Sequence, residues 1–475
     1  MKQAIHIRVD GNAQIGHGHY VRCIALAQML NHRFECHFYS ITFPEGILTV
    51  LEQEGCVLHH ISDESSFLEQ LSPGNLVVID GYGFDRSYQQ LVKQTGAVLC
   101  VIDDAPTGDY WADCLINHAP GNQATQLHLA PNGIHALGTD YALLRKQYQL
   151  KAKQQLTSGD LQTVLVCFGG SDPKHLTVST LRVLLELGTF QRINVVLGAS
   201  FQAVELVKEL ATKHPEITVH ISVSETEMIA LMEAGRFAIV PCSGMLLEAI
   251  ALNRTIISGY YVANQQQFYT QFRSLNCFLD AADFNRQSLQ KALGELSHNS
   301  TKTTGIIDGF APSRIRNLFA RLSHLEETYL TEAVPEDELT TFKWASDPAV
   351  RAFSFSDKPI VWEEHQAWFQ RKIRSNDCQY YIARMGNAAV GSIRFDQVDD
   401  AAVISYLLDL AFHGKGLGTW LLKAGMEQLF VDLPFSFREI TGSVINSNIP
   451  SLKSFEKLNF EKTEREGVIT FRRMI

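Results

Sequence analysis

The chain of 475 residues is long enough for about three domains of ordinary size. Its charged fraction of 19% and hydrophobic fraction of 45% are those of an ordinary globular protein. The formal net charge of −10 argues against nucleic acid as the main partner, because binding a phosphate backbone needs a basic surface. A small anionic ligand is still compatible with this charge, since a helix N-terminus can bind one.

Cysteine usage and hydropathy point to the cytoplasm. Nine cysteines are scattered between Cys23 and Cys378 without a C-x-x-C pair, which is typical of free thiols in a reducing cytosol. No apolar run approaches the roughly 20 residues of a membrane span. The first ten residues are typical of a strand rather than of a signal peptide. We therefore expect a cytoplasmic protein without a membrane partner.

Short apolar runs alternate with helical stretches up to about residue 320. The runs are continuously apolar rather than alternating, as in strands that are buried on both faces of a parallel sheet. Helices such as 19–30 and 246–252 are expected between them, and this rhythm predicts a doubly wound α/β fold. The expected strands are residues 4–9, 35–40, 76–81, 97–103, 163–170, 193–198, 237–241 and 255–259.

The polar segment 144–160 interrupts this rhythm, and we interpret it as a connection between two similar halves. Each half begins with a strand that leads into glycines, at 7–18 and at 166–172. We expect two Rossmann-like halves, 1–150 and 151–325, in a GT-B arrangement. Ligands would then bind between the halves, outside the carboxyl ends of the strands.

A second change of pattern near residues 321–338 predicts a separate α+β domain over 326–475. Segments 379–385 and 388–395 flank a short turn and are typical of an antiparallel hairpin. A further strand is expected from residue 402, followed by a glycine-rich turn and a helix.

The tetrapeptide Gly16-His17-Gly18-His19 lies between the first expected strand and the first expected helix. Glycines there let the backbone approach a ligand, and the N–H groups at the helix N-terminus suit a diphosphate. Two histidines two residues apart on a turn point in different directions, which disfavours a metal site. From spacing alone, His19 is either a catalytic residue or a residue that caps or packs at the helix start.

Residues 8–27 resemble the opening of the nucleotide-sugar hydrolases of pseudaminic acid biosynthesis, roughly R-x-D-x-x-x-x-I-G-x-G-H-x-x-R-C-x-x-L-A. The resemblance extends to about residue 320. It implies a GT-B fold and hydrolysis of UDP-2,4-diacetamido-2,4,6-trideoxy-β-L-altropyranose to UDP and the free sugar. The matching residues are Arg8, Asp10, Ile15, Gly16, Gly18, His19, Arg22 and Cys23, and further matches follow at 78–83, 101–104, 138–145, 168–173, 243–252 and 264–265.

The resemblance assigns the general base to His19 and an active-site role to Tyr82. A neutral imidazole can take the proton of the attacking water, and its ordinary pKa near 6.5 suits that step. Backbone N–H groups of the 169–172 turn and a helix N-terminus, rather than a metal, would meet the charge of the leaving group. Tyr82 is otherwise an aromatic residue packed at a strand end, and Glu248 is otherwise a solvated helix residue. The implied nucleotide- and sugar-binding residues are Asp10, Gly16, Gly18, Gly169, Gly170, Ser171, Ser243, Gly244, Glu248 for the ribose hydroxyls, and Asn264 and Gln265 for the sugar.

Residues 413–418 resemble the acetyl-CoA loop of the GNAT-family N-acetyltransferases, [RQ]-x-x-G-x-[GA]. A strand, a turn of backbone N–H groups and a helix N-terminus together cradle the pyrophosphate of coenzyme A. Residues 442–460 resemble the next motif of that family, N-x-x-S-x-x-x-[YF]-x-x-x-G-F, so the resemblance covers 328–475 and implies acetyl-CoA as co-substrate. The implied acetyl-CoA-binding residues are Leu408, His413, Gly414, Lys415, Gly416, Leu417, Gly418, Asn448 and Ser451.

One departure from the family pattern concerns the proton donor. Phe455 stands where many family members have a tyrosine that protonates the departing thiolate, and phenylalanine cannot donate a proton. A water, Tyr406 or Ser405 would have to replace it. Residues 342–355 resemble the opening of the acetyltransferases that act on UDP-4-amino sugars in the same pathway.

The two resemblances together predict a bifunctional enzyme. Its C-terminal domain would acetylate the 4-amino group of UDP-4-amino-4,6-dideoxy-N-acetyl-β-L-altrosamine, and its N-terminal part would hydrolyse the product. The alternative is a GT-B glycosyltransferase, or a hydrolase of another UDP-sugar, joined to a degenerate acetyl-CoA-binding module.

Overall fold

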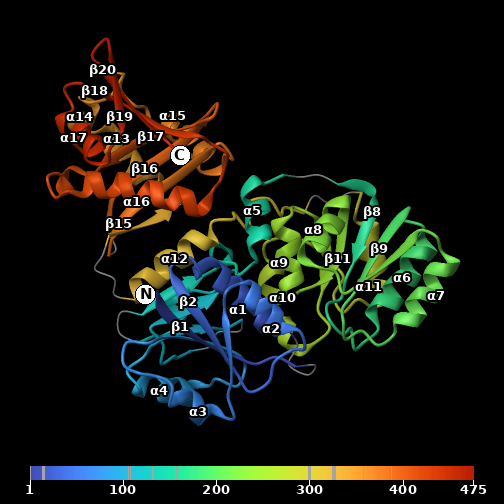
Figure 1. The fold of residues 1–475 in the computed structure, drawn as a ribbon. Coiled ribbons are helices and arrows are strands. Elements are labelled where there is room, and N and C mark those ends of the chain that lie inside the picture. Colours follow the sequence, from blue (N-terminus) through green and yellow to red (C-terminus); the bar gives the residue numbers. More distant parts are fainter. Residues whose placement is uncertain are drawn as a thin grey trace. The chain divides into compact units, whose positions relative to one another are not determined.

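The computed structural model divides into two compact units, Met1–Ile315 and Arg316–Ile475 (Figure 1). Helix α12 (Ala311–Leu322) crosses this division, so the first unit ends ten residues before the boundary expected at 325. The structure describes residues 2–12, 17–104, 106, 108–130, 133–156, 159–297, 301–323, 328–356, 358–386 and 388–475.

The first unit contains two parallel sheets, and the first has the order β3-β2-β1-β4-β5-β6-β7 in the described residues. Successive strands are added on one side of β1 and then on the other, so the strand order reverses between β1 and β4. In open α/β sheets, ligands bind outside the carboxyl ends of the strands at such a reversal. The strands are β1 (Gln3–Val9), β2 (Phe34–Ser40), β3 (Val57–His60), β4 (Leu76–Asp80), β5 (Val98–Ile102), β6 (Cys114–Asn117) and β7 (Ile134–Leu137).

Helices cover both faces of this sheet. Helix α1 (Gly18–Leu30) follows β1 and packs on β1 and β2. The opposite face carries a buried cluster to which α3 and α4 contribute Phe67 and Val92. The remaining helices of this half are α2 (Ile47–Gln53), α3 (Glu64–Leu68) and α4 (Arg86–Gln94), with short 3₁₀ turns η1 (Ala124–Gln126) and η2 (Thr139–Tyr141).

The second sheet, also parallel, has the order β10-β9-β8-β11-β12-β13 within the described residues, and its strand order reverses between β8 and β11. Its strands are β8 (Asp160–Val166), β9 (Arg192–Leu197), β10 (Ile217–Ile221), β11 (Gly235–Pro241), β12 (Thr255–Gly259) and β13 (Leu279–Asp280). One face is covered by α6 (Leu176–Leu187), α7 (Val204–Lys213) and α11 (Arg286–Gly294), and the other by α8 (Glu225–Ala234), α9 (Gly244–Ala251) and α10 (Gln266–Arg273), as Figure 1 shows. A 3₁₀ turn, η3 (Ala263–Gln265), precedes α10.

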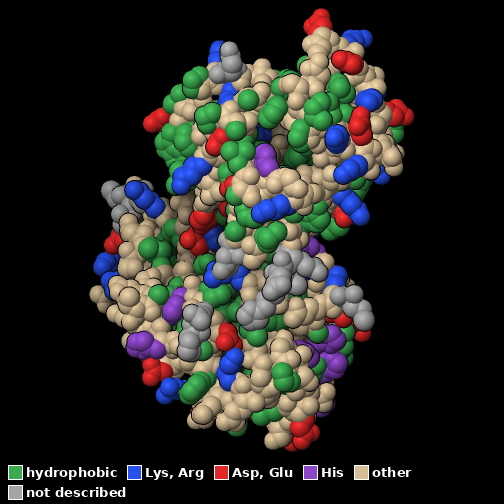
Figure 2. Space-filling model, turned by 90° about the vertical axis from the view of Figure 1, so that its left-hand side faces the viewer, with side chains coloured by type: hydrophobic (Ala, Val, Ile, Leu, Met, Phe, Trp, Pro, Cys, Tyr) green, Lys and Arg blue, Asp and Glu red, His purple; other side chains and the backbone are tan. Residues whose placement is uncertain are grey.

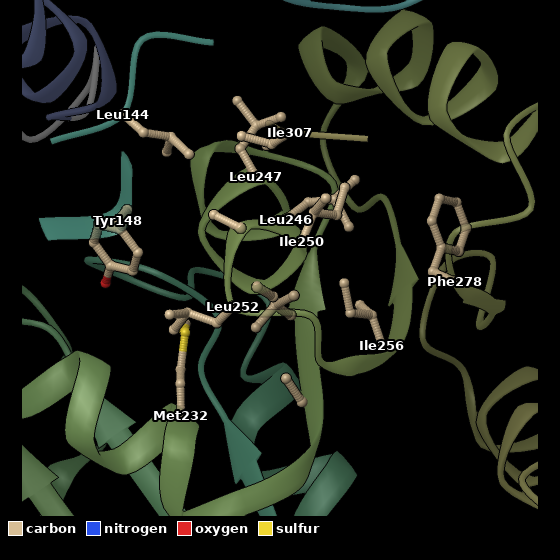
Figure 3. Close-up of a cluster of buried hydrophobic side chains, with 14 of the residues drawn as sticks. Leu144, Tyr148, Met232, Leu246, Leu247, Ile250, Leu252, Ile256, Phe278 and Ile307 are labelled. Atoms are coloured by element: carbon tan, nitrogen blue, oxygen red, sulfur yellow. The ribbon is translucent and has the colours of Figure 1, made fainter. Parts of the chain in front are cut away.

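The polar segment between the halves forms a docked helix, α5 (Lys146–Gln154). Its Tyr148 and Ala152 are buried in the core of the second half, where Tyr148 belongs to the same cluster as Met232 and Leu247 (Figure 3). The segment expected to be only a connection therefore contributes to the second core.

The second unit is built on a mixed sheet of order β14-β15-β16-β17-β18-β20-β19 in the described residues. Among the described strands of this sheet, β17 and β18 alone pair in parallel, and their pairing covers Ala401–Ile404 against Glu439–Gly442. Because β17 continues to Leu408, the two strands part beyond Ile404. The strands are β14 (Thr328–Glu332), β15 (Cys378–Met385), β16 (Ala388–Val398), β17 (Ala401–Leu408), β18 (Glu439–Ile445), β19 (Glu461–Arg465) and β20 (Val468–Met474).

Helix α16 (Leu417–Asp432) packs on this sheet, with Leu422 and Met426 in a core that also contains Ile393 and Phe455. The other helices are α13 (Glu338–Ser346), α14 (Pro348–Arg351), α15 (Trp362–Arg374) and α17 (Ile449–Lys457), with 3₁₀ turns η4 (Pro335–Asp337) and η5 (Leu410–Phe412).

The predicted fold class, two parallel Rossmann-like sheets followed by an α+β domain, is confirmed. Each strand expected before residue 260 has a counterpart in β1, β2, β4, β5, β8, β9, β11 or β12. The prediction missed the short strands β3, β6, β7, β10 and β13.

Acidic and basic side chains are interspersed on the face shown in Figure 2, so this face carries no single basic patch. Each of the nine cysteines is a buried free thiol. Among the helices of the described residues, none is both long and apolar enough to cross a membrane.

Candidate functional site

The carboxyl ends of β1 and β4 bring His19 and Asp80 together at the reversal of the first sheet. His19 is in the first turn of α1, Asp80 is the last residue of β4, and both side chains are buried. The His19 Nδ1 atom lies 2.7 Å from Asp80 Oδ1. An ionised carboxylate only accepts hydrogen bonds, so this contact needs the proton on Nδ1, whereas Arg22 Nη2, which only donates, lies 3.0 Å from the same atom. The shorter contact with Asp80 favours the tautomer with the proton on Nδ1 and the lone pair on Nε2. This tautomer is the one that a general base at Nε2 requires.

Arg22, one turn further along α1, keeps Asp80 ionised. Its guanidinium binds both carboxylate oxygens of Asp80, with a distance of 2.5 Å from Nε to Oδ2, and also binds Asp104. Burial alone would raise the pKa of Asp80, but Arg22 and His19 hold this pKa below its usual range. Two-point binding by a guanidinium also fixes the orientation of the carboxylate that orients His19.

Asp104 extends this group of charges to a second histidine. Burial opposes ionisation of Asp104 as well, but Arg22 and His118 hold its pKa well below the usual range. His118 Nε2 lies 3.4 Å from Asp104 Oδ1, and the ring packs edge-on against Phe268 of the second half at 5.9 Å. We call His19, Asp80, Arg22, Asp104 and His118 the charge network. Of its five members, only His19 was among the residues predicted for the site.

Tyr82 lies beside the charge network and reaches the second half. Its ring meets the His19 ring edge-on, with 4.9 Å between ring centroids. The Tyr82 hydroxyl accepts a hydrogen bond from Asn264 Nδ2 at 3.4 Å. Tyr82 is 60% exposed, so it is not an aromatic packed in the core at a strand end. Three predicted residues from both halves, His19, Tyr82 and Asn264, therefore converge.

Two other predicted residues of the first loop have different surroundings. Both carboxylate oxygens of Asp10 are engaged, Oδ2 by Arg8 at 2.6 Å and Oδ1 by the backbone N–H groups of Ile41 and Thr42. Asp10 thus ties the loop after β1 to the end of β2. Gly18, the first residue of α1, is exposed and has open space where a side chain would stand. Gly16 lies outside the described residues.

In the second half, the N-terminus of α6 is already occupied. The Asp172 carboxylate accepts from the backbone N–H groups of Leu176 at 2.9 Å and Thr177 at 2.8 Å. An anion at this helix end would meet a buried carboxylate. The predicted turn residues Gly169, Gly170 and Ser171 precede Asp172, and the last two are exposed.

The N-terminus of α9 is less occupied. Ser243 is its N-cap, and its hydroxyl accepts from the Met245 N–H at 3.4 Å, while Gly244 is exposed with open space around it. This helix end follows β11, directly at the reversal of the second sheet. It therefore offers N–H groups and the positive end of the helix dipole to an anion.

Glu248 lies on the buried side of α9 rather than in solvent. Its Oε1 accepts from Arg145 Nη2 at 3.0 Å, and burial raises its pKa although Arg145 opposes this shift. The surroundings of Glu248 exclude the alternative of a solvated helix residue.

Gln265, at the end of η3, accepts a hydrogen bond from the Tyr261 N–H through its side-chain oxygen at 3.2 Å.

The glycine-rich loop of the second unit joins β17 to α16. Gly414 and Gly416 have φ values of +73° and +79°, which favour glycine, and Gly416 is the N-cap of the 16-residue helix α16. Lys415 lies over the Phe412 ring at 4.9 Å, and His413 Nε2 lies 3.2 Å from the Leu408 carbonyl oxygen. The helix start is thus free of a side-chain cap and exposed, as a phosphate-binding loop requires. Leu417 and Gly418 are the first two residues of α16.

Residues of the following motif surround the hydroxyl group of Tyr406. Asn448 caps α17 by accepting from the Ser451 N–H at 3.2 Å, and Ser451 Oγ lies 2.9 Å from Tyr406 Oη. Burial raises the pKa of Tyr406, so its hydroxyl is protonated at neutral pH. Phe455 is fully in the core, stacked on Phe471 with 4.7 Å between centroids. The Tyr406 hydroxyl is therefore a proton donor close to Phe455, whose side chain cannot donate a proton.

A cavity of about 380 Å³ lies beside Tyr406 in the second unit. Helices α13 and α15 and strands β15, β16 and β17 line it, and they contribute His365, Trp368 and Tyr380 among others. The sequence prediction did not include this cavity or His365. Among the residues that the structure describes, no group of three or more histidine, cysteine or carboxylate side chains is arranged to hold a metal ion.

Residues 328–461 match the family model described as an acetyltransferase (GNAT) domain. This match confirms the predicted GNAT-like C-terminal domain. A putative phosphinothricin acetyltransferase of Bacillus subtilis, YwnH, is 29% identical over 119 residues, which cover 24% of this chain and 70% of YwnH.

Two further relatives extend into the first unit. The spore coat polysaccharide biosynthesis protein SpsG of Bacillus subtilis is 25% identical over 283 residues, which cover 58% of this chain and 83% of SpsG. An uncharacterized protein of Methanocaldococcus jannaschii, MJ1062, is 23% identical over 489 aligned positions and 97% of either chain. The first unit is thus similar to a protein named for polysaccharide biosynthesis, and MJ1062 matches this chain along nearly its whole length.

Proposed function

We propose that the chain is a bifunctional enzyme of nucleotide-sugar metabolism. The second unit transfers an acetyl group from acetyl-CoA to the 4-amino group of UDP-4-amino-4,6-dideoxy-N-acetyl-β-L-altrosamine. The first unit hydrolyses the resulting UDP-2,4-diacetamido-2,4,6-trideoxy-β-L-altropyranose to UDP and free sugar. The main support for the proposed hydrolase activity is the pairing of His19 with a buried, ionised Asp80 where the strand order of the first sheet reverses.

In the hydrolysis, His19 Nε2 takes a proton from water while the water oxygen attacks the anomeric carbon. The bond from that carbon to the diphosphate oxygen breaks, and UDP leaves with the bonding electrons. Asp80 orients the imidazole before the transfer and stabilises the imidazolium that forms, because its carboxylate stays ionised. A positioned base of this kind is worth roughly 10²–10⁴-fold in rate.

The second half would hold the nucleotide. The diphosphate would bind at the N-terminus of α9, at Ser243 and Gly244. The N-terminus of α6 is the less suitable site, because the Asp172 carboxylate already binds its N–H groups. Asn264, which already contacts Tyr82, would bind the sugar between the halves. Glu248 would bind the ribose hydroxyls by exchanging part of its contact with Arg145.

In the acetyl transfer, the loop 413–418 and the start of α16 would hold the pyrophosphate of acetyl-CoA. The amine attacks the thioester carbon, a C–N bond forms, and the C–S bond breaks. Tyr406 would donate a proton to the departing thiolate, because its hydroxyl is protonated and lies beside Ser451 of the second motif. YwnH, named a putative acetyltransferase, supports the reaction class, and SpsG supports a sugar context.

A one-pot reaction followed by mass spectrometry tests the proposal. It contains the protein, acetyl-CoA and the UDP-4-amino sugar, without any acceptor sugar. The wild type is expected to yield UDP and free diacetamido sugar. His19→Ala should stop at the acetylated UDP-sugar, whereas His17→Ala, an exposed neighbour, should behave as the wild type.

The outcomes separate the competing functions. If the acetylated UDP-sugar accumulates with the wild type and UDP appears only after an acceptor sugar is added, the first unit is a glycosyltransferase. If acetyl-CoA binds but no acetylated product forms, the second unit is a binding module. Either result would overturn the corresponding half of the proposal.

A further inference from the structure

The cavity of the second unit adjoins the stretch of sheet where β17 and β18 part. Ser405, Tyr406 and Leu407 line the cavity, and these are the β17 residues that follow the described pairing with β18 at Ala401–Ile404. Tyr406 contacts Ser451 and also forms part of the cavity wall. The cavity and the acetyl-CoA-binding motifs therefore share Tyr406.

His365 lies in this wall, and its contact with Thr341 indicates which ring nitrogen carries the proton. Its Nε2 is 3.2 Å from Thr341 Oγ1, and the Thr341 hydroxyl donates its own proton to a backbone carbonyl of the preceding turn, 2.9 Å from Glu338 O. Because a hydroxyl has one proton, Thr341 accepts from Nε2–H. The lone pair of the imidazole is therefore at Nδ1, which leaves that nitrogen as the acceptor for a proton.

The surroundings of His365 keep its imidazole neutral at neutral pH. The side chain is 5% exposed and packs among the rings of Phe342, Trp362 and Trp368. Burial lowers the pKa of His365, although Glu338 opposes this shift. The titratable and charged groups around it are Glu338 on α13, Glu364 on α15, Arg394 on β16, and the phenols of Tyr380 on β15 and Tyr406 on β17.

The remaining wall residues suit an amine on a small polar ring. Glu364 is exposed at the start of α15 and offers a negative charge to an incoming ammonium group. Trp368 and Tyr380 present aromatic surface, and Ser392 presents a hydroxyl group. A volume of about 380 Å³ is at the lower end of ordinary ligand sites, which suits one substituted ring rather than a whole nucleotide sugar.

Arg394 is the cation of this wall, and its charge is already compensated. Its guanidinium lies 4.8 Å from the Trp368 ring centre and donates to Asp396 at 2.7 Å. Its Nη2 also lies 3.3 Å from Ser405 Oγ. Arg394 thus holds neighbouring side chains of the cavity wall in place, and its compensated charge does not repel an ammonium group.

We propose that this cavity is the acceptor site of the second unit, that it takes the amino-bearing ring of the sugar, and that His365 is the general base. The proposal rests on the acetyltransferase function proposed above. The ammonium group of the acceptor gives one proton to His365 Nδ1. The neutral amine then attacks the thioester carbon of acetyl-CoA, forming the C–N bond and breaking the C–S bond. The second proton passes from the nitrogen to the thiolate through Tyr406, and the proton on His365 is released to water.

The pH dependence of kcat/KM for the acceptor tests this assignment. With a base, neutral His365 and the ammonium form of the acceptor react together, so kcat/KM stays level between the lowered pKa of His365 and the pKa of the acceptor amine. His365→Gln leaves only the neutral amine reactive. For this variant, log(kcat/KM) plotted against pH should then rise with unit slope up to the pKa of the acceptor amine. An NMR titration of the free acceptor measures that pKa. At neutral pH the loss should be roughly 10²–10⁴-fold and should shrink as the pH rises.

Two further variants test whether the effect of His365→Gln comes from loss of the base or from loss of structure. Thr341→Val removes the hydroxyl that fixes the tautomer and should shift the profile partly toward that of His365→Gln. Thr331→Val changes another buried threonine of the same unit, outside the cavity, and should keep the wild-type profile. Acetyl-CoA affinity, measured by calorimetry, should be unchanged in all three.

The possible failures are distinguishable. If His365→Gln lowers kcat/KM by the same factor at every pH, His365 is not the base. If the wild type transfers no acetyl group to an amino-sugar nucleotide, the proposed function fails and this assignment fails with it. If the wild type transfers the group and Trp368→Ala leaves KM for the acceptor unchanged, the cavity is not the acceptor site.

Discussion

At the scale of single residues, Asp80 combines two roles because it binds both His19 and Arg22. We expect Asp80→Asn to lower kcat of the hydrolysis by roughly 10²–10⁴-fold, since the amide no longer enforces the tautomer with the proton on Nδ1. KM for the nucleotide sugar should change little, because the proposed nucleotide site lies on the second half. Steady-state kinetics of UDP release measure both constants, and a fall in kcat/KM caused by KM alone would contradict this role.

The same carboxylate makes stability depend on pH. The pKa of Asp80 is lowered in the folded state, so its contribution is present above the ordinary carboxyl pKa and is lost as the pH falls through the folded value. Asp80→Asn should therefore destabilise the first unit by up to about 3–5 kcal/mol at pH 7 and by less near pH 3, because the loss begins below the ordinary carboxyl pKa. Asp109→Asn, in an exposed ion pair with His128, should cost no more than about 1 kcal/mol. Urea titrations at both pH values provide the comparison, and an equal cost of Asp80→Asn at pH 7 and pH 3 would contradict it.

Sequence patterns identified candidate site residues but not the residues that the structure places beside them. The motif at 8–27 identified His19 and placed it at the start of a helix, as the structure has it. It did not link Arg22 to Asp104 and His118, because those contacts join residues far apart in the chain that only the sheet brings together. His365 was missed for the same reason, since its tautomer depends on Thr341 of a different helix.

At the scale of elements, continuous apolar runs predicted the central strands, because those strands are buried on both faces. Four of the missed strands, β3, β7, β10 and β13, are the outermost strands of the two sheets, where polar residues are tolerated, whereas β6 is a buried inner strand of only four residues. For example, β3 (Val57–His60) ends in two histidines and has no fully buried residue, and β13 has two residues. Hydropathy patterns detect burial, and an edge strand forms through backbone pairing with much less burial.

The loop before α16 gives a prediction at this scale. Gly416 has a φ value of +79° at the N-cap, and a side chain there would favour another backbone conformation by about 1–2 kcal/mol. Gly416→Ala should weaken acetyl-CoA binding roughly 10-fold, because the N–H groups of the helix start lose their orientation. Gly467→Ala, in the β19–β20 turn at φ +78°, carries a similar backbone strain and should bind acetyl-CoA as the wild type does. Isothermal calorimetry measures both affinities, and equal losses would show that the strain acts on the whole unit.

At the scale of the whole molecule, the two proposed sites lie in separate compact units. We therefore expect variants of the two sites to complement each other in trans. A mixture of His19→Ala and Gly416→Val should convert the amino-sugar nucleotide to UDP and free sugar, because the acetylated intermediate diffuses from one chain to the other. Chromatographic detection of free sugar in the mixture, with each variant alone as control, checks this. Free sugar absent from the mixture would indicate that the intermediate stays on one chain.

The charge network has a consequence for the end of the hydrolytic cycle. One guanidinium, that of Arg22, stands between two ionised carboxylates, so these three groups together carry one negative charge beside His19. In the proposed hydrolysis the nucleotide gains negative charge when the anomeric bond breaks, and the field of the charge network acts over roughly 8–10 Å in physiological salt. On the proposed function, this charge would repel the product more strongly than the substrate, so the arrangement that orients the proposed base would also favour the departure of UDP.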